Sequence, residues 1–557
     1  MATLQFKGKS AVWNHHLSVP YHTLEKDAKK SLKGVDVEEN LIIEGDNLLA
    51  LKSLLPKYQG QIKCIYIDPP YNTGNEKWVY SDNVNSPTIK EWFDNVVGKE
   101  GEDLTRHDKW LCMMTPRLKL LRDLLASDGV IFISIDENEI YNLRSLMNEI
   151  FGPQNFIAEL PTIMNLKGNQ DEFGFAGTHE YTIVWAKQRD ENLHLNEFDI
   201  DEEEMEKWEE DEIGYFKRGA NLKATGVNAP REKRPNLFFS IYVTKNDEIL
   251  LEKRNKGDAE LLPIADNKEM SWRWSKDKIS REPYNLIVAR DGDDVTVYKK
   301  QRPSLGDIPS KKPKSIFYKP EYSSGNGTAQ LKSIFGKKIF DNPKPVDLIL
   351  DFLKIGSNKD SIVLDSFAGS GTTAHAVLDL NSEDEGKRKF VLVQLPEKIE
   401  EDRPAYEAGF RWVHEITRER VKRVIAKNKY KTGFTYYTLG SSIDAESILM
   451  GKLPTYKEFA KYVYYLATGK NHPDEKKIKE EYSFVGKTDH QSVYLVYEKN
   501  ADALKKLAIT LDWAQKTHKK DSNKKIVYAP ACYLDDEALE QFNIKFVSIP
   551  YNLFERQ

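Results

Sequence analysis

The 557-residue sequence has few cysteines, no long apolar segment and no excess of positive charge. Its three cysteines, Cys64, Cys112 and Cys532, lie far apart and show neither CxxC nor any other metal-ligand spacing. This argues against a disulfide framework or a metal site and is typical of buried thiols in a reducing compartment. No apolar run approaches the roughly 18 residues of a membrane span, and the first residues lack the apolar core of a signal peptide. We therefore expect a soluble, cytoplasmic protein that binds no metal.

The composition is that of a globular chain, with 40% hydrophobic and 30% charged residues. A chain of this length is too long for one ordinary core and predicts several domains. The net charge of −5 gives no general preference for nucleic acid, although a local basic surface could still bind phosphate.

Alternating strand and helix patterns predict an open α/β sheet. Lys63–Asp68 is a continuous apolar run that ends in an acid, as expected of a strand buried on both faces of a parallel sheet. A helix over 110–126 leads through a turn into a strand over 130–135. Further elements of this kind are expected at 139–150, 180–186, 361–365, 389–393 and, as one long helix, 406–427. This β–α–β order favours a parallel sheet.

The composition changes between the two parts that carry this pattern. Residues 199–212 are dense in acids, which favours a solvated helix face, and the chain turns basic from 301 to 338. We interpret the interruption as an inserted domain. The predicted boundaries are an N-terminal extension at 1–38, a sheet domain in two halves at 39–190 and 331–434, an insert at 191–330, and a small α/β C-terminal domain at 435–557.

The first motif with chemical meaning is Asp68-Pro69-Pro70-Tyr71. It follows a predicted parallel strand, where open α/β sheets bind their ligands. The prolines end the strand and fix the backbone, and we expect the Pro70 carbonyl to face the cleft. Together with the Asp68 carboxylate it would accept the two hydrogens of an exocyclic amine, while Tyr71 could stack on a flipped base. An ordinary strand-ending turn is the alternative.

The second motif runs from Ile362 to Thr373. A buried strand ends at Asp365, a glycine turn follows, and a helix begins near Thr372. Glycines let the backbone approach a nucleoside-like ligand, and the N–H groups of a helix N-terminus suit a carboxylate. S-adenosylmethionine carries such a carboxylate and an amino group that Asp365 could bind. Alone, this pattern fits a plain strand–helix turn equally well, but both motifs on one sheet favour methyl transfer to an amine.

With these motifs the sequence resembles the β-group amino-methyltransferases and, more closely, the modification (Mod) subunits of type III restriction-modification systems. The resemblance covers roughly 38–190 and 325–430. It is carried by the segments NLIIEGDNLLAL at 40–51, IDPPYNTGN at 67–75, RLKLLRDLLASDGVIFISIDENE at 117–139, THEYTIVWAK at 178–187, FDNPKPVDLI at 340–349, VLDSFAGSGTTAHAV at 363–377 and FVLVQLPE at 390–397. It implies a Rossmann-like S-adenosylmethionine-dependent methyltransferase sheet, methylation of adenine N6 in duplex DNA, and a place at the nucleoid of a bacterium or archaeon.

The resemblance also implies roles for individual residues. Asp68, Pro69, Pro70 and Tyr71 would hold and activate the target adenine. Asp46 would lie near the adenosine moiety of the donor, Lys344 beside the cofactor, and either Gln394 or Glu397 at the ribose. A turn before a helix is an equally good interpretation of Lys344. The complete cofactor set is Asp46, Lys344, Asp365, Phe367, Ala368, Gly369, Gly371, Thr372 and Gln394.

For the insert the resemblance implies a target-recognition domain. Lysines at its basic end could neutralise phosphates, namely Lys311, Lys312, Lys314 and Lys319, and Tyr318 or Tyr322 could pack against sugar or base. A solvated surface is the alternative for each lysine. A homodimer and a helicase-nuclease restriction subunit are the implied partners. Family members with Asp before Pro-Pro mostly act on adenine, so the resemblance implies adenine through Asp68. Cytosine N4 stays the alternative substrate, and a role mainly as the DNA-reading subunit for the partner stays the alternative function.

Overall fold

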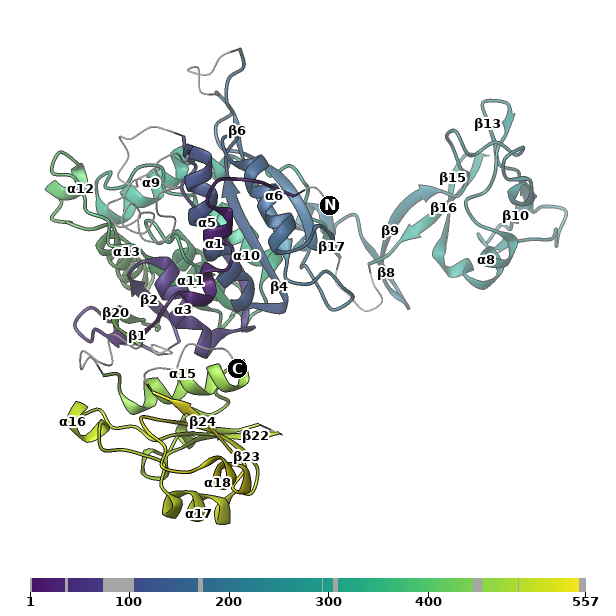
Figure 1. Ribbon diagram of the computed structural model, residues 1–557. Helices are drawn as coiled ribbons and strands as arrows, with labels where there is room; N and C mark the ends of the chain where they lie inside the picture. Colours follow the sequence, from purple (N-terminus) through teal and green to yellow (C-terminus); the bar gives the residue numbers. More distant parts are fainter. Residues whose placement is uncertain are drawn as a thin grey trace. The chain divides into compact units, whose positions relative to one another are not determined.

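The computed structural model describes residues 3–35, 39–73, 105–168, 174–292, 294–303, 309–443, 453–488 and 490–549. The chain divides into two compact units, one of Met1–Asn196 with Lys314–Gln557 and one of Glu197–Pro313 (Figure 1). Within the described part of the chain, no helix combines the length and the apolar character needed to cross a membrane.

A nine-stranded sheet forms the centre of the first unit, in the order β1-β20-β2-β19-β18-β3-β4-β6-β5. From β20 to β4 neighbouring strands run parallel, whereas β1, β6 and β5 each pair with a neighbour in antiparallel fashion. In sheet order the strands are β1 (Tyr21–Lys26), β20 (Thr435–Ile443), β2 (Leu41–Glu44), β19 (Lys389–Gln394), β18 (Ile362–Asp365), β3 (Ile62–Ile67), β4 (Leu125–Ile135), β6 (His179–Ala186) and β5 (Phe156–Ile163). The predicted α/β sheet is thereby confirmed.

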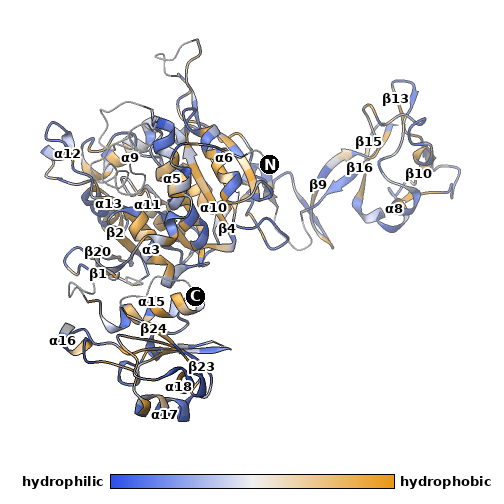
Figure 2. Ribbon diagram, in the orientation of Figure 1, coloured by the Kyte–Doolittle hydropathy of each residue, from blue (hydrophilic) through white to orange (hydrophobic). Residues whose placement is uncertain are grey.

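Helices cover both faces of this sheet, which explains the continuous apolar strands. On one face α3 (Asn47–Tyr58), α5 (Arg106–Leu124) and α6 (Ile140–Ile150) share a core with alternate residues of β3 and β4. On the other face α10 (Val346–Gly356) contributes Phe352, which stacks on Tyr66 and Phe132. The hydrophobic colouring is concentrated on these central strands and on the helix faces against them (Figure 2). Because helices cover both faces of the sheet, side chains on both sides of a central strand are buried, and the strand sequence is apolar throughout.

The helix expected over 406–427 is two helices, so that prediction is wrong. α12 (Pro404–Glu407) and α13 (Val413–Lys427) are separated by Gly409, whose φ of 97° cannot continue a helix. The Glu415 carboxylate then accepts the Trp412 backbone N–H at 3.0 Å and caps the new helix. The left-handed glycine thus ends the first helix, and the capping acid stabilises the start of the second.

The two strands at one edge of the large sheet come from segments beyond the predicted sheet domain, since β1 and β20 lie at 21–26 and 435–443. The C-terminal part has its own four-stranded sheet, β21 (Phe484–Lys487), β22 (Gln491–Leu495), β23 (Lys524–Ala529) and β24 (Ile544–Ser548), with helices α15 (Tyr456–Thr468), α17 (Leu511–Lys520) and α18 (Asp536–Gln541). Helix α15 joins it to the large sheet domain, because Tyr462 stacks on Tyr21 with ring centroids 4.6 Å apart.

The second unit, Glu197–Pro313, lies inside the interval of the predicted insert. It is built on β8 (Glu209–Asp211), β9 (Gly214–Asn221), β15 (Leu286–Asp291) and β16 (Asp294–Gln301), with β10 (Ile241–Val243), β11 (Ile249–Leu250), β12 (Ala259–Leu261) and α8 (Lys276–Arg281). Its own core includes Ile241, Trp272 and Val297. The acidic segment is helical only at α7 (Glu202–Met205), and Asp211 in β8 accepts hydrogen bonds from Arg302. The expectation of a solvated helix face therefore fails for most of this segment.

Candidate active site

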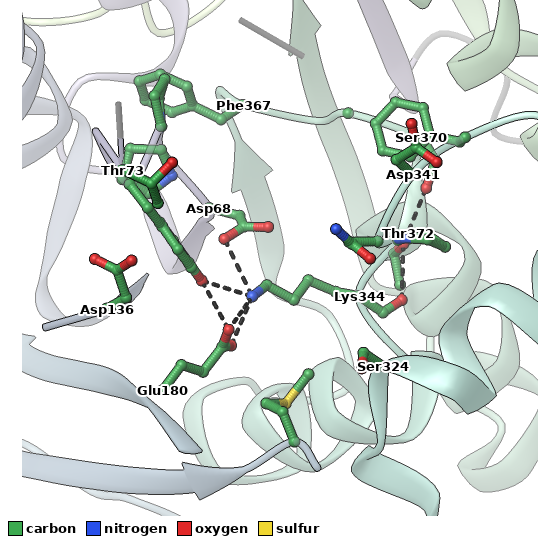
Figure 3. A pocket seen from close by; sticks show the side chains of 18 of the residues that line it. Asp68, Thr73, Asp136, Glu180, Ser324, Asp341, Lys344, Phe367, Ser370 and Thr372 are labelled. Atoms are coloured by element: carbon green, nitrogen blue, oxygen red, sulfur yellow. Dashed lines mark hydrogen bonds and ion pairs between the residues drawn. The ribbon is translucent and has the colours of Figure 1, made fainter. Parts of the chain in front are cut away.

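One pocket of about 520 Å³ brings the two predicted motifs together at the carboxyl ends of β3 and β18 (Figure 3). These strands are neighbours, with Val363 paired to Cys64, so the loops that follow them meet at one edge of the sheet. The predicted residues that line the pocket are Asp68, Pro69, Pro70, Tyr71, Lys344, Asp365, Phe367, Ala368, Gly369 and Thr372. A volume of this size is typical of a small-molecule site.

Asp68 lies at the wall of this pocket beside one cation and one anion. Its side chain is 29% exposed, and its Oδ1 atom is 3.4 Å from Nζ of Lys344. Burial raises the pKa of Asp68 to about 6, and Glu180 also raises it, whereas Lys344 lowers it. The group is therefore mainly a carboxylate at neutral pH and acts as a hydrogen-bond acceptor.

The Lys344 side chain belongs with the catalytic motif more than with the glycine loop (Figure 3). Its ammonium lies 2.6 and 2.7 Å from the two carboxylate oxygens of Glu180 and donates to the Tyr71 hydroxyl at 2.6 Å. Its backbone carbonyl faces the other way and accepts the Thr372 hydroxyl at 3.2 Å. Lys344 thus connects both motifs, and its place beside the cofactor stays a prediction.

The Pro70 carbonyl differs from the expectation. It accepts the indole N–H of the fully buried Trp110 at 2.7 Å, so the carbonyl is directed into the core and fixes the turn. The prediction that Pro70 accepts a hydrogen of the target amine is therefore wrong. No described residue donates a hydrogen bond to the carbonyl of Pro69, which also lines the pocket.

Asp365 organises the glycine loop from within. Its two carboxylate oxygens accept the backbone N–H of Phe367 at 2.9 Å and the hydroxyl of Thr373 at 2.5 Å. Burial raises the pKa of Asp365 to about 7. Gly371, with φ of 83°, precedes the first residue of α11 (Thr372–Asp384). The loop therefore presents the start of a helix to the pocket, as the sequence predicts.

Three of the predicted cofactor residues do not line the pocket: Asp46, Gly371 and Gln394. The fully buried amide of Gln394 accepts the Gly369 N–H at 2.7 Å and donates to the Leu395 carbonyl at 3.2 Å. Because both ends of the amide are used, the expected contact of Gln394 with ribose is not supported. Asp46 caps α3 and forms an ion pair of 3.2 Å with Arg117.

A buried arginine behind the glycine loop escaped the sequence analysis. Arg420 of α13 is fully buried and donates to the hydroxyls of Ser370 and Thr372 at 2.8 and 2.7 Å. Burial lowers the pKa of Arg420 to about 9, so it remains a cation at neutral pH. Glu180 was missed as well, although it lies in a segment that carries the resemblance; its only signal is an acid at the start of a buried strand.

The residues predicted to bind DNA differ in their surroundings: some form ion pairs, one is buried and others are exposed. Lys311 pairs with Glu204 at 2.9 Å, and Lys319 pairs with Asp351. Tyr322 is buried and donates to Asp351, so its predicted contact with sugar or base is wrong. Tyr318 is 49% exposed, and Lys312 and Lys314 are exposed as well.

The strand order, with the antiparallel β6 between β4 and β5 and two motifs at neighbouring strand ends, defines a Rossmann-like methyltransferase. The DNA methylase family model matches residues 62–407, and the chain belongs to this family. The Mod subunit of the EcoPI type III restriction-modification enzyme, from Escherichia phage P1, is 47% identical over 419 residues; the match spans 71% of this chain but only 64% of the relative.

Three further matches are one enzyme sequence and two solved structures. The type II methyltransferase M.KpnI of Klebsiella pneumoniae is 32% identical over 400 residues, which cover 72% of this chain and 90% of that enzyme. Among solved structures, the complex of M1.HpyAVI with SAM covers 68% of this chain and 98% of its own, with a TM-score of 0.28 and 11% identity. The cytosine-N4-specific PvuII DNA methyltransferase covers 70% and 94%, with a TM-score of 0.32 and 12% identity.

Proposed function

We propose that the protein methylates N6 of adenine in duplex DNA and serves as the modification and sequence-recognition subunit of a type III restriction-modification or related defence system. The meeting of Asp68-Pro69-Pro70-Tyr71 with the glycine loop in one pocket is the observation that carries this proposal. The name of the relative at 47% identity, a type III Mod subunit, supports the class of system.

The donor proposed for this pocket is S-adenosylmethionine, and the residues present fit it. The start of α11 offers backbone N–H groups to its carboxylate, and the buried Arg420 adds positive charge behind them. Phe367, Ala368 and Gly369 supply an apolar wall and a close backbone approach. When bound, the donor would supply a methyl group activated by a sulfonium.

On the acceptor side Asp68 and Pro69 hold the target amine. The Asp68 carboxylate accepts one hydrogen of N6, and the Pro69 carbonyl accepts the other, which favours a nucleophilic nitrogen. Tyr71 packs against the face of the flipped base. N6 would become positively charged as its bond to the methyl group forms and the sulfur–methyl bond breaks, with a neutral thioether as the leaving group; its N–H bond then breaks and Asp68 takes the proton.

The purified chain tests this chemistry directly. We expect N6-methyladenine, identified by mass spectrometry, after incubation with duplex DNA and S-adenosylmethionine. Asp68→Ala should lower kcat by about a thousandfold or more and leave donor affinity by calorimetry within a few-fold, because the carboxylate acts on the amine alone. Asp128→Ala, which removes an acid paired with Lys63 elsewhere on the sheet, is the control and should be fully active. Undiminished turnover in Asp68→Ala would exclude the proposed role.

The remaining parts of the chain would serve recognition and assembly. We propose that the unit Glu197–Pro313 reads the DNA sequence, and that the C-terminal part supports a homodimer or the docking of a helicase-nuclease restriction subunit. Light scattering of the purified chain should give twice its mass of 64.2 kDa. A monomer at micromolar concentration would contradict the homodimer without affecting the catalytic proposal.

A further inference from the structure

A lysine–glutamate pair lies against the proposed catalytic carboxylate and comes from two elements outside its motif. Lys344 precedes α10, and Glu180 lies in β6. We infer that Lys344 and Glu180 are positioning residues: Lys344 keeps Asp68 ionised, and Glu180 holds the Lys344 ammonium back from Asp68 so that the target amine can reach the carboxylate. This inference rests on the proposed function of Asp68.

The distances from the Lys344 ammonium to Glu180 and to Asp68 differ, which distinguishes its hydrogen-bond partner from the group on which its charge acts. The Lys344 ammonium is 2.6 Å from the nearest Glu180 oxygen but 3.4 Å from Oδ1 of Asp68. Glu180 and Tyr71 therefore hold the ammonium in hydrogen-bond contact, and Asp68 receives its field without a short hydrogen bond. A direct contact at the shorter distance would occupy a lone pair that the amine needs.

The Lys344 side chain is well placed to act as a fixed cation. It is 10% exposed, and the Glu180 side chain is 13% exposed. Burial alone would lower the pKa of Lys344, but Asp68 and Glu180 outweigh burial and raise it. The ammonium thus stays charged throughout the working pH range and is poorly screened by salt.

The charges around Asp68 are otherwise acidic or neutral. Tyr66 and Tyr71 come from its own strand and loop, and Asp365 from β18 adds a further carboxyl group. The other titratable side chains lining this pocket are Asp136, Glu137, His179 and Asp341. Among the described residues of the lining, Lys344 is the sole lysine or arginine. Without it, burial and neighbouring acids act together to protonate Asp68.

The pH profile of kcat/KM tests the lysine. In the wild type we expect an acid limb near pH 6, from Asp68. Lys344→Met keeps the stem and removes the charge, so the pKa of Asp68 rises and the acid midpoint moves up by about one pH unit or more. The loss of activity is then at least about fivefold greater at pH 6 than at pH 8.5. Lys344→Arg should restore the wild-type midpoint, and Lys354→Met, which removes a lysine paired with Glu383, should not move it.

Substitution of Glu180 should move the acid midpoint of the kcat/KM profile in the opposite direction. Glu180→Gln removes the negative charge of residue 180, which raises the pKa of Asp68 in the wild type. The acid midpoint of the variant therefore falls below that of the wild type. At neutral pH kcat/KM also falls, because the released ammonium of Lys344 moves onto Asp68 and competes with the amine. A purely structural pair would shift neither midpoint and would lower activity by one factor at every pH.

The outcomes separate the inference from the proposed function. If Asp68→Ala is inactive but both Lys344→Met and Glu180→Gln keep the wild-type midpoint, the inference is wrong and the catalytic role of Asp68 stands. If Asp68→Ala remains active, the proposed function itself fails. A large loss of donor affinity in Lys344→Met, measured by calorimetry, would make Lys344 a donor-binding residue and would also overturn the inference.

Discussion

At the scale of single residues, Trp110 shows how the core fixes the catalytic turn. Its indole N–H donates to the Pro70 carbonyl at 2.7 Å, and the side chain is fully buried. A proline pair cannot adjust its φ angles, so this one hydrogen bond fixes the Pro70–Tyr71 peptide, which directly follows the Pro69–Pro70 peptide. The geometry of the acceptor site therefore depends on a residue 40 positions away.

Trp110→Phe removes that hydrogen bond and keeps an aromatic ring. The buried Pro70 carbonyl is left without its partner, which costs about 1–3 kcal/mol of stability. We expect a lower melting temperature and a several-fold drop in kcat, with donor affinity unchanged. Trp185→Phe is the control, because the Trp185 indole N–H has no hydrogen-bond partner among the described residues. Equal effects of both substitutions on kcat would exclude a special role of the Trp110 bond.

At the scale of elements, the glycine loop is held by partners on two other elements. Gln394 at the end of β19 accepts the Gly369 N–H, and Arg420 of α13 donates to two loop hydroxyls. Gly371 itself has φ of 83°, and a Cβ atom there would lie 3.1 Å from the Thr417 carbonyl oxygen. The start of α11 is thus fixed before any ligand binds, which favours tight donor binding.

Gly371→Ala tests this preorganisation. The left-handed conformation costs an alanine about 1–2 kcal/mol, and the contact with Thr417 adds to it, so the loop must shift. We expect donor affinity by calorimetry to fall about tenfold or more. Gly469→Ala is matched in conformation, since its φ is 62° and a Cβ there meets nothing within 4 Å. It should lose stability without losing affinity; unchanged affinity in Gly371→Ala would contradict the account of the loop.

At the scale of the whole molecule, the second unit is an insertion in the sequence of the first. Its first and last strands, β7 (Phe198–Asp199) and β17 (Ser310–Lys311), pair with each other, so the two ends of the unit are adjacent. The unit also has its own core around Trp272. An insertion of this kind adds a function without changing the fold that receives it.

Replacing 200–309 by a short glycine–serine linker should therefore leave the large unit folded. We expect unchanged donor affinity and a melting temperature within a few degrees, because the linker needs only to join two paired strands. DNA methylation should be lost, since sequence reading is assigned to the removed unit. Methylation of the same DNA motif by the shortened chain would contradict that assignment. Loss of donor binding would contradict the independence of the two units.

The sequence predicted the parts of this fold that local patterns determine. Continuous apolar runs revealed β3 and β18, and the motifs after them located the pocket. Contacts between distant segments were beyond such patterns. A charged residue in α13 is typical of a solvated face, yet Arg420 is buried. No pattern in the sequence near Pro70 predicts the hydrogen bond of its carbonyl to Trp110. Tertiary contacts also decide which carbonyl and which amide stay available to a ligand.

The most direct test of the central claim is modification-sensitive sequencing of DNA from cells that express the chain alone, beside cells that express Asp68→Ala. The account predicts N6-methyladenine at one short sequence motif in the first sample and none in the second. N4-methylcytosine in place of N6-methyladenine, or an identical methylation pattern in the two samples, would contradict it.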